Sequence, residues 1–426
     1  MSIFVKRSGR YLLQPFVLFL ALTLLLSGCA APGVSGNYIP FWHTLTGAKE
    51  RALLELVDRW NANNPTGSVI VPERKDLVNL RGAISKNLAA NAMPSLLLVP
   101  STQAANLQRK DLLAPLDEYL NGSAGFTADD RADFLPFVLQ AGKTGDGRTW
   151  ALPFGGAARA VLMNSDWLSS LGYQNVPADW DNFGQACTRA SDSRRGTECF
   201  TVSTNGEDFA DWVLANGGKL ISNDLSRVTL TGDVPVAAMN RLLTIVRANQ
   251  VYRVNTLAQE RDEFASGRAL FGFDWTDTLS QYETQIKQAA NFEWGIDRLP
   301  GEAGKTANQF RAPVLALMRT IPAKQAAAWQ FARWLMEPAQ TRFWADRTGD
   351  LPARFSALSD ANTPRARAIR RIAQSAVAEP FVSGWDCAAK AMSNAFTQIL
   401  DGGVLTQTLT QGQFVAQADL NSYCGP

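Results

Sequence analysis

Histidine, the side chain that most often moves protons in enzymes, occurs once in this chain, as His43. A Ser-His-Asp or Cys-His mechanism would have to use it, and no G-x-S-x-G motif marks a nucleophilic serine. Neither a Walker loop nor a G-x-G-x-x-G loop is present. Acidic residues are plentiful, so hydrolysis by paired carboxylates stays open, although no acidic pair stands in a setting typical of such a site. The sequence therefore gives no specific support to an enzyme, and no cofactor is expected.

The cysteines favour disulfide bonds over a metal site. Apart from Cys29, the chain has Cys187, Cys199, Cys387 and Cys424, an even number that allows three pairings. We expect Cys187–Cys199 and Cys387–Cys424, because each pair lies within one neighbourhood of the sequence. There is no CxxC motif and only one histidine, so we expect no metal site.

The N-terminus has the pattern of an export signal. Three basic residues precede a mostly apolar run over residues 11–26, which is short for a membrane span. The tetrapeptide Leu-Ser-Gly-Cys at 26–29 resembles the bacterial lipobox, which implies removal of residues 1–28, acylation of Cys29 and a linker over 29–37. The chain is then expected outside the cytoplasm, anchored to the cell membrane by lipid. The alternative is an uncleaved N-terminal anchor helix with an incidental cysteine.

The charge and length of the chain after residue 28 indicate its class and its number of lobes. Without residues 1–28, the count is 38 basic against 39 acidic residues, so nothing indicates a nucleic-acid partner. No later stretch is apolar enough to cross a membrane. About 390 residues are too many for one ordinary hydrophobic core, so two lobes are expected.

Strands and helices alternate along the chain. Strands are predicted at 37–42, 68–73 and 94–100, and helices at 47–65 and 77–91, which is the β-α-β-α-β order of a doubly wound α/β sheet. Further on, an apolar strand over 312–322 precedes a helix over 323–336. Three tryptophans at helical positions are assigned to the core: Trp60, Trp329 and Trp334.

Four stretches in order carry a family pattern: 39–65, 147–183, 263–276 and 348–358. The chain resembles the extracellular solute-binding proteins of bacterial ABC importers, in the group that binds carbohydrates and glycerol phosphate. One departure is at 308–313, where family members often carry a Gly-Gly stretch and this chain reads NQFRAP, with Arg311.

The resemblance implies a two-lobed, type II periplasmic-binding-protein fold whose doubly wound sheets are joined by a three-crossing hinge. The crossings are placed near 155–161, 298–311 and 350–353, where glycine or proline is present. Lobe 1 would comprise 38–156 and 300–350, and lobe 2 would comprise 157–299 and 351–426. The protein would act as a monomer that passes its solute to ABC permease subunits.

The residues that could hold the solute follow strands. Aromatic rings cover the apolar faces of a sugar, and planar polar groups bind its hydroxyls. Open α/β sheets bind ligands in loops at strand ends. The predicted ligand-binding residues are Trp42, His43, Thr44, Thr46, Ser101, Thr102, Gln103, Asp274, Trp275, Thr276, Arg311 and Trp385.

Structural roles compete with several of these assignments. Trp42 could face the core, the 101–103 segment could cap a helix, and Arg311 could form a salt bridge at the hinge. Arg354 is assigned a structural role. The leading hypothesis is a lipid-anchored binding subunit for a sugar or polyol. A glycerol-phosphate or glycerophosphodiester binder is the alternative, motivated by Arg311, and a secreted glycosidase or a surface adhesin is a more distant one.

Overall fold

The computed structural model describes residues 38–90, 92–203, 206–302, 306–360 and 362–422. The predicted signal peptide, the linker, Cys29 and Cys424 lie outside the described residues, so lipidation and the Cys387–Cys424 bond stay predictions. The disulfide between Cys187 and Cys199 is confirmed. Among the described residues, no helix combines the length and the apolar character that a membrane span requires.

The first sheet has five strands in the order β2-β1-β3-β11-β4. Strand β1 runs parallel to β2 and β3, whereas β11 runs antiparallel to β3 and β4. The bounds are β1 Tyr38–His43, β2 Val69–Arg74, β3 Leu96–Pro100, β4 Ala151–Leu152 and β11 Pro313–Leu317. Its helices are α2 Gly47–Asn63, α3 Leu80–Ala89 with the preceding turn η2 Leu77–Asn79, α4 Ser101–Arg109, α5 Asp117–Asn121, α6 Ala128–Ala132, α13 Pro322–Leu335 and α14 Pro338–Thr348.

Helices cover both faces of this sheet. Phe41 and Leu98 belong to one buried cluster, which also contains Trp60 and Trp329 from helices α2 and α13. Their strand neighbours, among them Leu97, belong to a second cluster with side chains of α3 and α4. Successive strand residues point to opposite faces, so a sheet buried on both sides needs continuous apolar runs. This explains why the strands over 38–43 and 96–100 could be recognised from sequence.

The second sheet is built around β5, a ten-residue strand in which every residue is buried. It has the order β12-β5-β10-β13, and β8 and β9 also pair with β5. The bounds are β5 Gly155–Asn164, β8 Phe271–Trp275, β9 Trp294–Asp297, β10 Asn308–Arg311, β12 Leu351–Pro352 and β13 Ala376–Ala378, with a separate pair β6 Phe200–Ser203 and β7 Val251–Val254.

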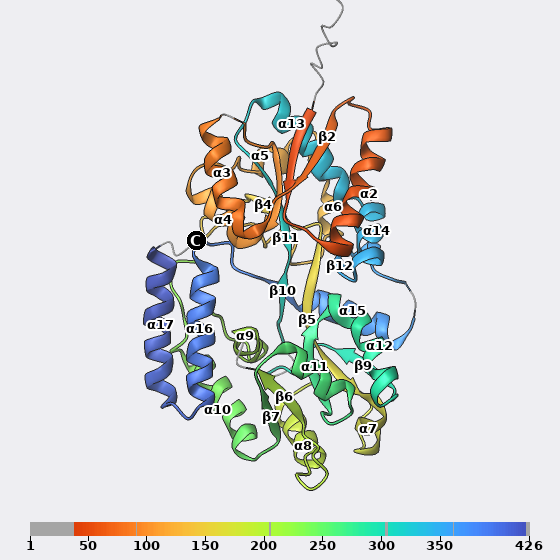
Figure 1. The fold of residues 1–426 in the computed structure, drawn as a ribbon, viewed down its shortest axis with the longest axis vertical. Helices are drawn as coiled ribbons and strands as arrows, with labels where there is room; N and C mark the ends of the chain where they lie inside the picture. The colour runs from red at the N-terminus through yellow and green to blue at the C-terminus, as the bar shows by residue number, and fades with distance from the viewer. Residues whose placement is uncertain (1–37, 91, 204–205, 303–305, 361, 423–426) are drawn as a thin grey trace, which may run out of the picture.

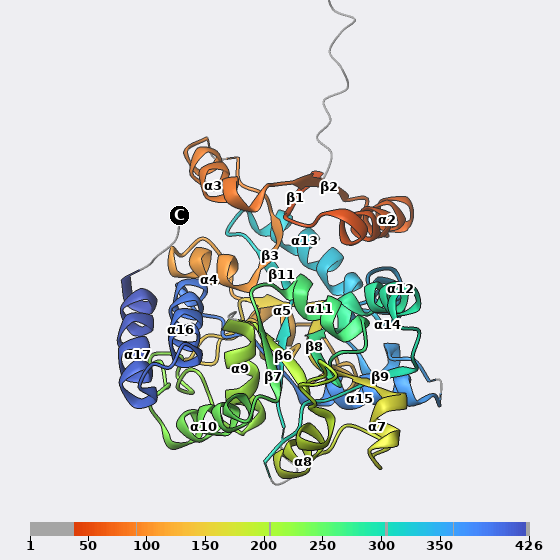
Figure 2. The ribbon, with the colours of Figure 1, turned by 60° about the horizontal axis from the view of Figure 1, so that its bottom comes forward.

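The helices of this half surround the second sheet, and α16 and α17 lie side by side along one flank (Figure 1 and Figure 2). Helices α16 and α17 pack with β5 and β8 around a separate apolar cluster that includes Phe183, Phe271 and Trp385. The bounds are α7 Ser165–Ser170, α8 Trp180–Ala190, α9 Gly206–Ala215, α10 Asp233–Arg247, α11 Leu257–Ala265, η3 Thr276–Thr278, α12 Leu279–Ala289, η4 Phe355–Ala357, α15 Pro364–Ser375, α16 Trp385–Leu400 and α17 Leu405–Ser422.

The chain passes between the two sheets at β4–β5, at β10–β11 and at α14–β12. These places agree with the three predicted crossings, and Figure 1 shows β5 and β10 running between the two halves of the molecule. Glycine is required at the first crossing because a Cβ on Gly155 would lie 2.5 Å from the Trp344 ring, and one on Gly156 would lie 2.5 Å from the Arg311 carbonyl oxygen.

A short segment over 379–383 makes an additional contact between the halves. The Phe381 side chain is buried in the cluster that contains Trp42 and the α3 and α4 side chains. The Ser383 hydroxyl donates to Asn106 Oδ1 at 2.8 Å. The predicted boundaries assign this segment to lobe 2, yet its side chains pack on α4 of the first lobe. We call residues 379–383 the strap.

Candidate ligand-binding site

A cavity of about 840 Å³ lies between the two halves. This volume is within the range of about 300–1,000 Å³ that is typical of small-molecule sites. Lobe 1 contributes residues from 140–147, and the second half contributes helix α9, the segment 219–225 and the start of α16. The end of β8, strands β10 and β13, and the strap complete the lining. A molecule bound here would contact both halves at once.

Trp275, Arg311 and Glu207 form one group in the wall of the cavity. The Arg311 guanidinium lies 4.0 Å from the centre of the Trp275 ring, and Arg311 Nη1 lies 3.3 Å from a Glu207 oxygen. The indole N–H of Trp275 donates to the other Glu207 oxygen at 2.9 Å. Arg311 is 45% exposed, whereas Trp275 is only 3% exposed, because the guanidinium covers the ring. Arg311 therefore presents the larger contact area to a ligand.

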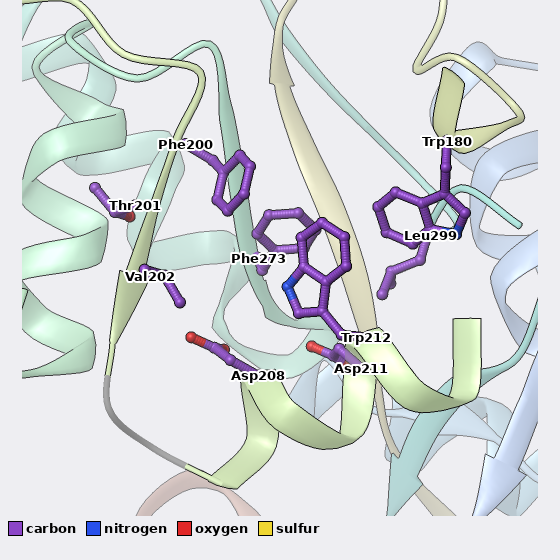
Figure 3. A pocket seen from close by; sticks show the side chains of 9 residues that line it. All are labelled: Trp180, Phe200, Thr201, Val202, Asp208, Asp211, Trp212, Phe273 and Leu299. Carbon is purple, nitrogen blue, oxygen red and sulfur yellow. The ribbon is translucent and has the colours of Figure 1, made fainter. Parts of the chain in front are cut away.

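Helix α9 places Glu207 by burying its other face. Asp208 and Asp211 on that face bind the fully buried Arg159 of β5, at 2.8 and 2.6 Å. Figure 3 shows these two carboxylates on the helix, next to the aromatic rings of Trp212, Phe200 and Phe273. The gap lined there is about 10 Å³, too small for a solute. The ion cluster therefore positions α9 and does not bind the ligand itself.

Gln309 connects this cluster to the cavity. Its amide donates to the Glu207 carbonyl and to Asp211 Oδ1, both at 2.7 Å. Because Gln309 lies on β10, next to Arg311, the strand and the helix are fixed relative to each other. The side chains that face the cavity are held in place by these bonds before any ligand arrives.

Lys49 links α2 of the first lobe to the second half of the molecule. Its ammonium donates to Asp277 at 2.9 Å and to Asp350 at 2.8 Å. Asp277 also lies 3.7 Å from Arg311, so the ion pairs extend from the hinge to the cavity wall. The pKa of Asp350 is raised because its burial outweighs the attraction of Lys49. The pKa of Lys49 is raised because the two carboxylates outweigh its burial.

Glu379 of the strap lines the cavity and accepts a hydrogen bond from the Ser101 hydroxyl at 2.7 Å. Ser101 is the first residue of α4, so this bond joins the strap to the first lobe. Burial raises the pKa of Glu379, and the carboxylates of Asp386 and Glu207 raise it further, against the effects of Ser101 and Arg311.

The structure brings together four of the predicted residues. Trp275, Arg311 and Trp385 line the cavity, and Ser101 lies beside it through Glu379. Trp385 is 4% exposed and packs largely in the core of the second half. The residues that are absent from the lining are Trp42, His43, Thr44, Thr46, Thr102, Gln103, Asp274 and Thr276.

Three of the absent residues correct the predictions. Trp42 is buried against α3 and α4 and lies under the Lys75 ammonium, which is 4.3 Å from the ring centre. His43 is 2% exposed, and burial lowers its pKa. Asp274 is buried and accepts from Arg261 Nε at 2.6 Å and from the Tyr282 hydroxyl at 2.9 Å. All three are covered by their own lobe.

The remaining predicted residues lie at the strand ends but outside the cavity. Thr46 is the N-cap residue of α2, although its side chain makes no capping bond. The Thr276 hydroxyl accepts from the buried Ala158 N–H at 3.2 Å, which gives it a structural role. Arg354 is structural as predicted, because Asp130 and Asp133 hold its buried guanidinium.

Sequence reasoning missed Glu207, Gln309, Glu379 and Lys49. Glu207 and Glu379 each follow a strand, the signal used for the predicted residues, but the strand before Glu379 has only three residues, and Glu207 lies four positions after the end of its strand. Across the described ranges, no group of three or more His, Cys, Asp or Glu side chains is placed to hold a metal ion.

Two lobes that share one cavity define a protein that binds a solute between them. The family model described as bacterial extracellular solute-binding protein matches residues 55–370. The chain belongs to this family, which confirms the prediction made from the four sequence stretches.

Similar proteins include both binders named in the prediction. The sn-glycerol-3-phosphate-binding periplasmic protein UgpB of Escherichia coli K12 is 24% identical over 355 residues, or 78% of this chain and 77% of UgpB. Among solved structures, the sugar-binding protein MalE of Xanthomonas citri has a TM-score of 0.80 at 19% identity, covering 90% of this chain and 98% of that one. The cyclic alpha-maltosyl-1,6-maltose binding protein of Arthrobacter globiformis has a TM-score of 0.77 at 17% identity, with 90% and 99% covered. These structures confirm the two-lobed α/β fold.

Proposed function

We propose that this protein captures a sugar or sugar-like polyol between its lobes and delivers it to an ABC permease, without chemical turnover. The observation that carries the proposal is the cavity of about 840 Å³ that both halves line, with an indole, a guanidinium and carboxylates in its wall. Carboxylates and guanidinium groups bind hydroxyls through planar, charge-assisted hydrogen bonds, and stacked planar groups cover the C–H face of a sugar ring.

The charges in the wall disfavour an anionic ligand. Glu207, Glu379 and Asp386 all line the cavity. Arg311 is already paired with Glu207 and lies near Asp277, so its positive charge is largely balanced. The lysines of the lining, Lys143, Lys219 and Lys390, are exposed at the surface, where water and salt weaken their fields.

Glycerol phosphate is the second candidate. It is supported by the UgpB relatives, which are named for sn-glycerol-3-phosphate, and by the 45% exposure of the Arg311 side chain. An anion could bind Arg311 if it displaced Glu207, and Arg is well suited to a phosphate because it donates two parallel hydrogen bonds.

Ligand binding would act through the equilibrium between open and closed forms. Shifting a two-state clamp from mostly open to mostly closed needs about 5 kcal/mol of difference in affinity. Several buried hydrogen bonds and one stacked planar group supply an energy of this order. The proposed ligand-contacting residues are Ser101, Glu207, Trp275, Gln309, Arg311, Glu379 and Trp385.

Calorimetric titration and thermal shift with sugars, polyols and glycerol phosphate test the proposal. We expect a sugar to bind, and Trp275→Ala to weaken it at least about tenfold, because the change removes the ring beneath the Arg311 guanidinium and the anchor of Glu207. Arg311→Ala should abolish binding only if the ligand is an anion. Binding of glycerol phosphate alone would select the second candidate, and unchanged affinity in both variants would place the ligand elsewhere.

The proposed location rests on Cys29. We infer that this residue carries the lipid that keeps the protein beside its permease. Mass spectrometry of the membrane-extracted protein should find an acylated N-terminal cysteine, and Cys29→Ser should release the chain from the membrane. A Cys29→Ser protein that stays in the membrane fraction would support the uncleaved anchor helix instead.

A further inference from the structure

The strap holds Glu379 at a fixed place where the two lobes meet. On its C-terminal side, Phe381 is buried in the first lobe, and Ser383 bonds to Asn106 of α4. The Glu379 backbone N–H donates to the Phe310 carbonyl of β10 at 3.0 Å, and its carboxylate accepts from Ser101 of α4. The carboxylate is therefore tied to both lobes and cannot move away from the cavity without breaking these contacts.

The surroundings of Glu379 leave its charge uncompensated. In the described part of the chain, no cationic side chain lies within ion-pair distance of the Glu379 carboxylate. The side chain that donates a hydrogen bond to it is the neutral Ser101 hydroxyl. Asp386 adds negative charge on the same wall, and the charge of Arg311 is already balanced by Glu207 and Asp277. Glu379 is partly buried, and a partly buried carboxylate without a cation is costly unless a partner supplies one.

We propose that Glu379 is a specificity residue that favours a sugar carrying a protonated amine over the same sugar without it. The inference rests on the proposed function, because it assumes that a sugar occupies the cavity. An ammonium group offers three N–H donors and a positive charge. One donor would bind the Glu379 oxygen that Ser101 leaves free, and the charge would offset the Glu379–Asp386 pair. Hydrogen bonds between charged groups are about twice as strong as neutral ones, so the preference should be about tenfold or more.

The test uses matched sugars and a matched variant. Calorimetry compares three pairs at a pH that keeps the amines protonated. Glucose is compared with glucosamine, galactose with galactosamine, and cellobiose with the β-1,4-linked disaccharide of glucosamine. Wild-type protein should bind the amine of a pair at least about tenfold more tightly. Glu379→Gln keeps the shape and the Ser101 contact but removes the charge, so it should reduce the ratio to about threefold or less. Glu118→Gln, on the exposed surface of α5, is the control and should leave the ratio unchanged.

The outcomes separate this inference from the proposed function. Equal or tighter binding of the neutral sugars by wild-type protein overturns the role of Glu379 but keeps the sugar site. A full amine preference in Glu379→Gln also overturns it. If no sugar of either kind binds, the proposed function itself fails. Should Glu379→Gln not fold, Asp386→Asn removes the neighbouring charge and should lower the same ratio severalfold; an unchanged ratio there contradicts the inference.

Discussion

Glu260 makes the stability of the second lobe depend on pH. Its side chain is 5% exposed and lies beside Asp208, in the buried cluster around Arg159. Burial raises the pKa of Glu260 from its usual 4.5 to about 7, against the attraction of Arg159 and hydrogen bonds with Ser203 and Asp208. Burial and the charge of Glu260 also raise the pKa of Asp208. The pair therefore holds a proton at pH values at which the unfolded chain has released it.

The sign and the size of the effect follow from proton linkage. Between pH 4.5 and pH 7, the folded state binds more protons than the unfolded state, so the free energy of unfolding falls as the pH rises. Each pH unit contributes up to about 1.36 kcal/mol, which gives a loss of about 3 kcal/mol across this window. Stability from this group is complete below about pH 4.5 and is lost by about pH 7. Glu260→Gln cannot ionise and should remove this part of the pH dependence.

Urea denaturation of the wild type and Glu260→Gln at pH 5 and pH 7.5, followed by tryptophan fluorescence, measures the difference. The wild type should lose about 2–3 kcal/mol more than the variant between the two pH values, because titrating groups outside the Glu260–Asp208 pair affect both proteins equally. Glu118→Gln, which changes an exposed carboxylate, should follow the wild type. A wild type and a Glu260→Gln variant that change in parallel would refute the assignment of a shared proton to this cluster.

Two further predictions concern the hinge and the disulfide. Lys49→Met and Asp277→Asn each remove the same ion pair across the lobes. Small-angle scattering should therefore show a more open protein in both single variants and little further change in the double variant. Additive changes would show that the two residues act separately. Replacing both Cys187 and Cys199 by serine should cost about 2–3 kcal/mol of unfolding free energy for a 12-residue separation, measured by urea denaturation, and a loss below about 0.5 kcal/mol would contradict this.

Most of the fold could be predicted because its central strands are buried on both faces. The residues 38–43 and 96–100 form apolar runs that have few alternatives to a central strand, and the helices between them carry apolar stripes. The three crossings could be placed because glycine and proline mark them. The strap could not, because only the folded arrangement shows that Phe381 packs with α4 of the other lobe.

The site was predicted less well because a strand end does not reveal which side chain faces the ligand. Asp274 and Trp275 are neighbours on β8, yet they point to opposite sides of the strand, one to Arg261 and the other to the cavity. Trp42 and His43 failed for a related reason: both faces of their sheet are covered, so neither direction leads to solvent. A one-residue difference in register decides such assignments.

The residues that sequence reasoning missed depend on contacts between distant segments. Glu207 reaches the cavity because Asp208 and Asp211 bind Arg159, about 50 positions earlier in the chain, and so fix the rotation of α9. No local pattern in the 206–215 helix distinguishes its cavity-facing acid from its buried ones. The buried arginine therefore has an indirect part in binding: it selects which of three acidic side chains the ligand meets.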